Sequence, residues 1–228
     1  ALALAEAGAD VAGLDRGPSA ATGAAVQAHG RRYREVVCDL RAASVADLNA
    51  VVAGVVRDLG RLDILVNNAG IIRRAPAIDF SEADWDDVLQ IDLKAAFFLA
   101  QAAARVMIPQ GGGKIINTAS MLSFQGGIIV PSYTAAKSGL AGITRALANE
   151  WAKHGVNVNA IAPGYMATEN TAALRLNPER APAILERIPA GRWGEPADLQ
   201  GAVVFLASAA SNYVHGAILP VDGGWLTR

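Results

Sequence analysis

The chain has 228 residues, of which 52% are hydrophobic, and its 20 basic and 21 acidic side chains leave a net charge of −1. The length suits one large α/β domain, and the near-zero charge argues against nucleic acid or an anionic membrane as the main partner. The single cysteine, Cys38, excludes a disulfide framework and a multi-cysteine zinc site. Since it lies in an apolar run, we expect a buried, inert thiol.

The first residues, ALALAEAGAD, resemble the last turns of a helix rather than a signal peptide, because no basic segment precedes them. A doubly wound sheet normally places a strand and a glycine-rich, phosphate-binding turn before such a helix. Both are absent from the 228 residues, so we expect an N-terminally incomplete domain.

Short apolar runs alternate with segments at helical spacing along the rest of the chain. Runs typical of buried strands occur at 11–14, 35–38, 64–67, 114–118, 156–162 and 217–221. Helices are predicted over 19–29, 44–59, 82–107, 132–153 and 196–208. Strands that are apolar on both faces indicate a parallel sheet between helical layers. We therefore predict a doubly wound, Rossmann-like α/β/α fold in one domain, 1–228.

One stretch, 163–195, shows neither pattern and holds four prolines. It follows the strand that ends near Ala162, so it lies at the carboxyl edge of the sheet, where open α/β folds bind ligands. Long irregular connections in compact domains are usually functional. We predict that this stretch is a substrate lid.

Two predicted strand ends carry residues suited to a nucleotide. Asp15 ends the first strand, where a carboxylate can accept both hydroxyls of an adenosine ribose and disfavours a 2′-phosphate. Asn67-Asn68-Ala69-Gly70 ends the third, where small and amide residues let the backbone approach a flat ligand. Ordinary turns use the same residues. Arg16 beside Asp15 suits a phosphate, so NAD is preferred over NADP without being proved.

Tyr133 and Lys137 lie four residues apart on a predicted helix, so they share one face. An ammonium beside a phenol favours the phenolate, which can exchange a proton with a carbonyl or alcohol oxygen. Ser120 follows the strand at 114–118 and could donate to the same oxygen. The alternatives are an exposed Tyr/Lys pair and a loop serine. No cluster of side chains suggests a catalytic metal.

Together these residues resemble the classical short-chain dehydrogenase/reductase family from end to end, apart from the glycine-rich start. Residues 67–70 match its NNAG motif, and Ser120, Tyr133 and Lys137 match its Ser…Tyr-x-x-x-Lys core at the expected spacing. The segment 163–168 matches the part that meets the nicotinamide, and 221–224 matches the usual ending.

The resemblance implies a role for each residue. Tyr133 would be the general acid/base, Lys137 would hold the nicotinamide ribose and promote ionisation of the tyrosine, and Ser120 would orient the substrate oxygen. Asp92 joins this catalytic set as a departure, because the family has an asparagine there that helps to hold a water. The implied cofactor contacts are Asp15, Asp39, Leu40, Asn67, Ala69, Gly70, Tyr133, Lys137, Pro163, Gly164, Met166 and Thr168.

Longer segments, such as 67–74 and 147–168, resemble sugar-acid dehydrogenases of the family and imply hydride transfer to or from a deoxy-aldonate. Its carboxylate suits an arginine clamp. The predicted substrate contacts are Arg73, Arg74, Met121, Gln125, Tyr165 and Arg175, with Arg192 as a further arginine. The alternatives are a gluconate 5-dehydrogenase, a 3-oxoacyl carrier-protein reductase, or a non-catalytic protein on the same fold.

The helices predicted over 82–107 and 132–153 are apolar on more than one side, so they need a second burial surface. The family's usual assembly is a homotetramer through these two helices, and we expect the same here. With no targeting segment and one thiol, we expect a cytoplasmic enzyme.

Overall fold

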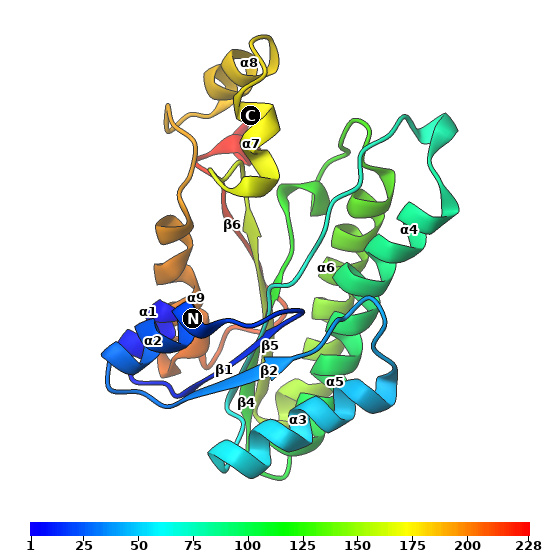
Figure 1. Cartoon of the computed structure of the whole chain (residues 1–228). Helices are drawn as coiled ribbons and strands as arrows, with labels where there is room; N and C mark the ends of the chain where they lie inside the picture. The colour runs from blue at the N-terminus through cyan, green and yellow to red at the C-terminus, as the bar shows by residue number, and fades with distance from the viewer.

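The computed structural model describes residues 1–228 and arranges six strands in two hydrogen-bonded sheets (Figure 1). In the smaller sheet β1 (Val11–Asp15) pairs with β2 (Tyr33–Val37). The larger sheet has the order β3 (Ile64–Asn67), β4 (Gly113–Thr118), β5 (Val156–Pro163) and β6 (Ile218–Val221). Every strand pair is parallel, as predicted. The single continuous sheet that we expected is divided, because no strand pairs with both β1 and β3.

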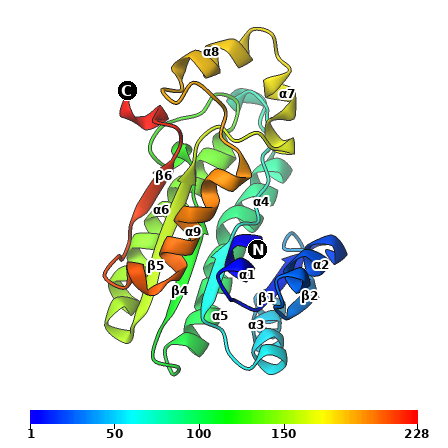
Figure 2. The same cartoon turned by 90° about the vertical axis from the view of Figure 1, so that its left-hand side faces the viewer.

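Helices cover both faces of the larger sheet, which confirms the predicted three-layer arrangement (Figure 2). On one face lie α5 (Ala96–Met107) and α6 (Pro131–Trp151), and on the other lies α9 (Gln200–Ala207). Near the smaller sheet, α1 (Leu2–Glu6) contacts α9 and α2 (Ala20–Ala28), and α3 (Val45–Leu59) packs against α5. None of these helices combines the length and apolar character of a membrane span.

The main core lies where β4 and β5 meet α5 and α6. Ile115, Val156 and Val158 are fully buried there against Met107 and Leu147. Each fully buried aliphatic side chain of this size contributes about 1.5–3 kcal/mol to folding. The core therefore fixes α6 against the centre of the sheet and so positions the helix that carries Tyr133 and Lys137.

The segment predicted as one helix over 82–107 has three parts. It begins as α4 (Glu82–Leu89), widens into the π-helical turn η2 (Gln90–Ala95) and continues as α5. Single π turns inside α-helices occur frequently at functional sites. Asp92 lies in this turn.

The predicted lid, 163–195, is partly helical rather than irregular. It contains a 3₁₀ turn, η5 (Glu169–Thr171), and the helices α7 (Ala172–Arg175) and α8 (Arg180–Arg187). Ile184 on α8 and the following Ile188 are buried against Met121 and Trp225. This small core orders the stretch and holds it over the carboxyl edge of the larger sheet, as Figure 1 shows.

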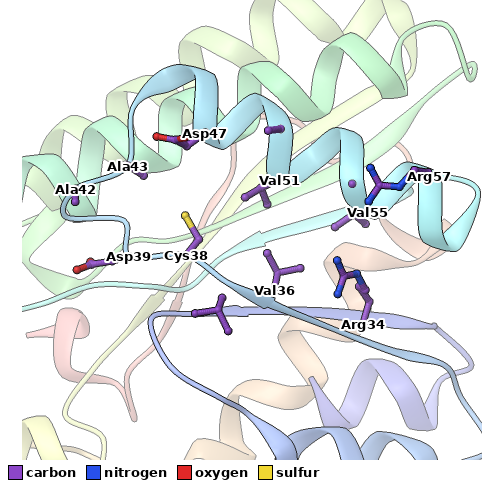
Figure 3. Close-up of a pocket in the computed structure, with 13 residues that line it drawn as sticks. Arg34, Val36, Cys38, Asp39, Ala42, Ala43, Asp47, Val51, Val55 and Arg57 are labelled. Carbon is purple, nitrogen blue, oxygen red and sulfur yellow. The ribbon is translucent and has the colours of Figure 1, made fainter.

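Cys38 lies just after β2 and is half-buried, so the expected full burial is wrong. Its sulfur lines a cavity of about 500 Å³ between β2 and α3, whose apolar lining consists mostly of valines and alanines (Figure 3). Burial raises the pKa of the Cys38 thiol, and the charges of Asp47 and Asp39 raise it further. The thiol therefore stays protonated and is a poor nucleophile, as the sequence suggested. None of the predicted catalytic residues lines this cavity.

Candidate active site

The predicted catalytic residues meet at the carboxyl end of β4. The Lys137 ammonium donates a hydrogen bond of 2.9 Å to the carbonyl of Thr118, the last residue of β4. It also lies 5.4 Å from the centre of the Tyr133 ring. Ser120 follows two residues after Thr118 and is buried. The strand end and the helix thus place all three predicted residues at one edge of the sheet.

Two further serines fix the turn that carries Ser120. This turn, η3 (Met121–Ser123), packs against α6. Ser123 Oγ donates to the Lys137 carbonyl at 2.7 Å, and Ser138 Oγ donates to the Leu122 carbonyl at 3.2 Å. These bonds hold Ser120 against the part of α6 that bears Tyr133 and Lys137, which preorganises the set.

Asp92 is the buried partner of Lys137. Lys137 Nζ lies 3.2 Å from Asp92 Oδ2, and the side chains are 3% and 0% exposed. Asp92 Oδ1 accepts a hydrogen bond of 2.8 Å from the Ile71 N–H. Burial raises the pKa of the Asp92 carboxyl, while the Lys137 charge and the Ile71 amide act in the opposite direction. The ion pair therefore joins the π turn, α6 and the loop after β3.

Gly70 covers this ion pair. A Cβ at Gly70 would lie 2.8 Å from Asp92 Oδ2 and 3.4 Å from Lys137 Nζ. The first distance is too short for any real side chain, so the loop 67–70 can lie on the pair only with glycine at its last position. Glycine is therefore needed at position 70 because the backbone lies so close to the ion pair, and not because of a special φ angle.

The Asn67 amide points into the protein. It donates to Asn117 Oδ1 at 2.9 Å and to the Ala96 carbonyl at 3.1 Å. Asn117 in turn donates to Thr144 Oγ1 at 2.9 Å. This row of buried polar groups ties β3 and β4 to α5 and α6. It leaves the backbone of Asn67, with the exposed Ala69 and Gly70, for the predicted cofactor contact.

The other predicted cofactor residues lie at three strand ends. Asp15 is exposed at the end of β1, and its Oδ1 accepts a hydrogen bond of 3.3 Å from the Gly17 N–H. Asp39 similarly accepts from the Arg41 N–H at 2.9 Å. The Leu40 side chain is buried in the core, so it has no free surface for a ligand.

The chain enters the lid through Pro163 and Gly164, where β5 ends beside β6. A Cβ at Gly164 would lie 2.6 Å from the Asp222 Cα, so glycine is required for the two strand ends to approach. Met166 is buried and forms an isolated β-bridge with Gly194, near the end of the lid. The turn is closed by the Thr168 N–H, which donates to the Met166 carbonyl at 3.0 Å.

The predicted substrate arginines fall into paired and unpaired groups. Arg73 forms ion pairs with Asp84 at 3.1 Å and Asp87 at 3.5 Å, so its guanidinium group is bound to α4. Arg192 makes two hydrogen bonds, of 2.7 and 2.8 Å, to the Asp198 carboxylate. Both charges are already balanced within the protein.

Arg74 and Arg175 lack a carboxylate partner. Arg74 donates to the Asn170 carbonyl at 3.0 Å, and Arg175 donates to the Thr168 carbonyl at 3.3 Å. The two exposed guanidinium groups therefore converge on one segment of the lid, 168–170, although they lie about a hundred residues apart in the sequence.

Met121, Gln125 and Tyr165 lie where the lid meets the C-terminal segment. The Tyr165 ring packs edge-on against Trp193 and Trp225, with ring centres 5.4 and 4.8 Å away. Gln125 Oε1 accepts a hydrogen bond of 3.3 Å from the indole of Trp225, and Met121 is buried in the same cluster. Burial raises the pKa of the Tyr165 phenol. Tyr165 also lines a cavity of about 270 Å³ beneath the lid.

Sequence reasoning missed Ile129, which stands between Ser120 and Tyr133. Its φ of 59° is the only positive value outside glycine, and this is an unusual conformation for a β-branched residue. The Ile129 carbonyl accepts a hydrogen bond of 3.1 Å from the Ala75 N–H. The contact joins the loop before α6 to the loop after β3, and backbone strain of this kind is often found beside active sites.

The sequence matches the family described as Enoyl-(Acyl carrier protein) reductase over residues 1–226. Together with the relatives below, this match shows that the chain belongs to the short-chain dehydrogenase/reductase family of oxidoreductases. It is 58% identical over 229 residues to the 2-dehydro-3-deoxy-D-gluconate 5-dehydrogenase of Escherichia coli (strain K12). The alignment covers 100% of this chain and 90% of that protein.

Solved structures show the same fold. A chain from Agrobacterium tumefaciens with bound NADP has a TM-score of 0.90 and 53% identity, covering 100% of this chain and 90% of that one. A gluconate 5-dehydrogenase from Burkholderia cenocepacia J2315, in complex with NADP and tartrate, has a TM-score of 0.94 and 38% identity. That match covers 99% of this chain and 89% of the other.

Proposed function

We propose that the chain is an NAD(P)-dependent dehydrogenase that interconverts a hydroxyl and a keto group of a deoxy-aldonate sugar acid. The observation that carries the proposal is the buried Lys137, tied to the end of β4 and 5.4 Å from the Tyr133 ring, beside the turn of Ser120. The 58% identity to the Escherichia coli enzyme supports this substrate class.

Tyr133 acts as general acid/base in this proposal. In oxidation its phenolate accepts the proton of the substrate hydroxyl, and in reduction its phenol returns a proton to the carbonyl oxygen. Lys137 stabilises the phenolate, and the Ser120 hydroxyl donates to the same substrate oxygen and orients it. The nicotinamide cofactor, when bound, accepts or supplies the hydride at the substrate carbon.

The direct test is an assay of the oxidation of 2-dehydro-3-deoxy-D-gluconate and of D-gluconate with NAD and with NADP, and of the reduction of the corresponding keto products. Gluconate is included because the Burkholderia cenocepacia structure, a gluconate 5-dehydrogenase, shares the fold so closely. Tyr133→Phe provides the matched inactive variant, since it removes only the hydroxyl. Absence of turnover on either sugar acid would reject the proposal.

The ends of β1 and β3 suit the adenosine half of a dinucleotide. Asp15 is exposed and free of ion pairs, so it can accept ribose hydroxyls and disfavours a 2′-phosphate. We infer a preference for NAD on this ground, whereas the two solved relatives above hold NADP. Asp15→Ser should raise the ratio of kcat/KM for NADP to that for NAD by about tenfold. An unchanged ratio would remove Asp15 as the discriminating residue.

Arg74 and Arg175 are the proposed clamp for the substrate carboxylate. Losing a charge-assisted hydrogen bond costs about 1.5–3 kcal/mol, so Arg74→Ala and Arg175→Ala should each raise KM by at least about tenfold. Arg73→Ala is the matched comparison, because the Arg73 charge is balanced by α4 and its loss should raise KM by less than about threefold. Equal effects in all three variants would contradict the clamp.

We also propose a homotetramer through the outer surfaces of α5 and α6, which lie side by side on one face of the sheet (Figure 1). Phe97 and Phe98 on α5 are half-buried and pack edge-to-face with ring centres 5.1 Å apart, which leaves an apolar surface for a second copy. Light scattering that gives a monomer at micromolar concentration would contradict the assembly. The cytoplasmic location stays a prediction.

A further inference from the structure

Asp92 and Lys137 form an ion pair closed off from solvent. The two charged atoms are 3.2 Å apart, and the side chains are 0% and 3% exposed. The backbone of Gly70 lies directly over them, since a Cβ there would come within 2.8 Å of Asp92 Oδ2. Bulk water is excluded at this distance, so each charge acts on its neighbours more strongly than at the surface.

The contacts favour a carboxylate over an amide at position 92. Asp92 Oδ1 is already used as the acceptor for the Ile71 N–H at 2.8 Å. An asparagine in the same orientation would turn its NH₂ group toward the Lys137 ammonium, and two donors cannot form a hydrogen bond. A buried ammonium without its carboxylate is strongly unfavourable. Asp92 therefore holds Lys137 through its charge, together with the Thr118 carbonyl, which accepts a hydrogen bond of 2.9 Å from the same ammonium.

The same charge acts on Tyr133. The ammonium 5.4 Å from the ring centre favours the phenolate, whereas the carboxylate beside the ammonium opposes it. Because the pair is neutral overall, the phenol faces a dipole instead of a full cation. We propose that Asp92 is a positioning residue that holds Lys137 jointly with the Thr118 carbonyl and delays ionisation of Tyr133 to a higher pH than the ammonium alone would set. This inference rests on the proposed role of Tyr133 as general acid/base.

Other charged groups near α6 do not share this role. On α4, Asp84 and Asp87 are ion-paired with Arg73, and Asp87 also with Arg41. The remaining charges on α6, on the elements packed against it and on the loop after β3 are exposed, so solvent and salt screen them. They are Arg74, Glu82, Asp86, Lys94, Arg105, Arg145, Glu150, Lys153 and His154.

Ultraviolet titration of the phenolate tests the proposal without substrate. The chain has four tyrosines, so the difference between each protein and its Tyr133→Phe counterpart isolates the Tyr133 signal. We expect Tyr133 to ionise about one pH unit lower in Asp92→Asn than in the wild type. Asp92→Glu keeps the charge and should stay near the wild-type midpoint. Asp87→Asn removes a neighbouring carboxylate and should also leave the midpoint unchanged.

The kinetic counterpart is the pH profile of kcat for oxidation. In Asp92→Asn it should move to lower pH by the same amount, so that turnover below the midpoint rises by up to about tenfold while KM for the sugar acid is unchanged. A purely structural role would not shift the profile.

Two outcomes would overturn the proposal: an unchanged or raised midpoint in Asp92→Asn, or a hundredfold loss of turnover in a folded variant. Should Asp92→Asn fail to fold, Asp92→Thr is also neutral and gives the same comparison. The titration uses no substrate, so a failed sugar-acid assay would reject the proposed function and still leave the ionisation of Tyr133 measurable.

Discussion

Each end of the larger sheet holds a lysine in a polar network, and the two networks differ in charge. At the carboxyl end Lys137 faces the Asp92 carboxylate at 3.2 Å. At the amino end Lys114, the second residue of β4, donates to neutral oxygens of Asn157, Ser211 and Asn212 at 3.1, 3.4 and 2.7 Å. Only the first lysine has a buried counter-ion.

The difference explains why one end is suited to chemistry and the other to structure. Burial lowers the pKa of the Lys114 ammonium, and no carboxylate opposes this effect. The Lys114 network ties β4 and β5 to the segment around Ser211, and none of the predicted catalytic residues belongs to it. Lys137 instead stands next to Tyr133 at the edge where the loops converge. A buried cation is thus informative about function mainly through its neighbours.

The largest effect is expected for Lys137→Met. Methionine has a side chain of similar length, but it lacks the charge that stabilises the phenolate. The buried Asp92 carboxylate is then left without a counter-ion. We expect kcat to fall by about a thousandfold and the free energy of unfolding to fall by about 3–5 kcal/mol. Steady-state kinetics and urea unfolding check the two effects. A Lys137→Met variant that retains a tenth of the wild-type kcat would show that catalysis does not depend on the charge of this lysine.

Asn159→Ala tests a purely structural contact, between the middle of β5 and the segment before β6. Asn159 is buried in β5, donates to the Val214 carbonyl at 2.8 Å and accepts from the Ala217 N–H at 2.9 Å. The substitution leaves both backbone groups without this partner, so we expect a loss of about 2–4 kcal/mol in unfolding experiments. Because both bonds go to the segment that leads into β6 and neither involves a predicted catalytic residue, kcat and KM should stay within about twofold of the wild type. A large change in kcat or KM would contradict the proposed division of the sheet into a structural part and a part suited to chemistry.

Lys114→Met is the matched counterpart of Lys137→Met. The lysine is only half-buried and the acceptor nearest to it, Asn212 at 2.7 Å, is exposed, so we expect a loss of no more than about 1 kcal/mol. Turnover should be unaffected, since the group is remote from Tyr133. Thermal unfolding and kinetics on the same preparation check both statements, and a stability loss equal to that of Lys137→Met would contradict the importance of the counter-ion.

Periodicity alone predicts most of the fold. The strand at 64–67 and the helix beginning near 132 are recognisable because their apolar residues recur at the spacing typical of each element. The structure has β3 and α6 at these places. The short helices of the lid were not predicted, because four prolines interrupt the pattern and their order comes from the contacts of Ile184 and Ile188 with distant residues. The division into two sheets likewise depends on which strands pair, and local spacing contains no information about pairing.

The residues of the site could be predicted where a sequence motif specifies the residue types. They could not be predicted where a residue's role depends on which side chains it contacts in the folded protein. The spacing of Tyr133 and Lys137 identified the helix face, but it could not show that Asp92 contacts Lys137 directly. Arg73 and Arg74 are adjacent and look equivalent in the sequence. The structure separates them, because two acids of α4 neutralise Arg73 while Arg74 reaches the lid.

The smallest effect concerns the exposed ion pair at the base of the lid. The Arg192 guanidinium beside Asp198 holds the pKa of that carboxyl well below its usual value of 3.8. A carboxyl whose folded-state pKa is depressed contributes stability above its unfolded pKa, and this contribution is lost as the pH falls toward the folded value. Asp198→Asn should therefore unfold at a slightly lower temperature than the wild type near pH 7, and the difference should begin to shrink below about pH 4 and narrow further as the pH falls. A difference in melting temperature that does not change as the pH falls would contradict a role for the Asp198 charge.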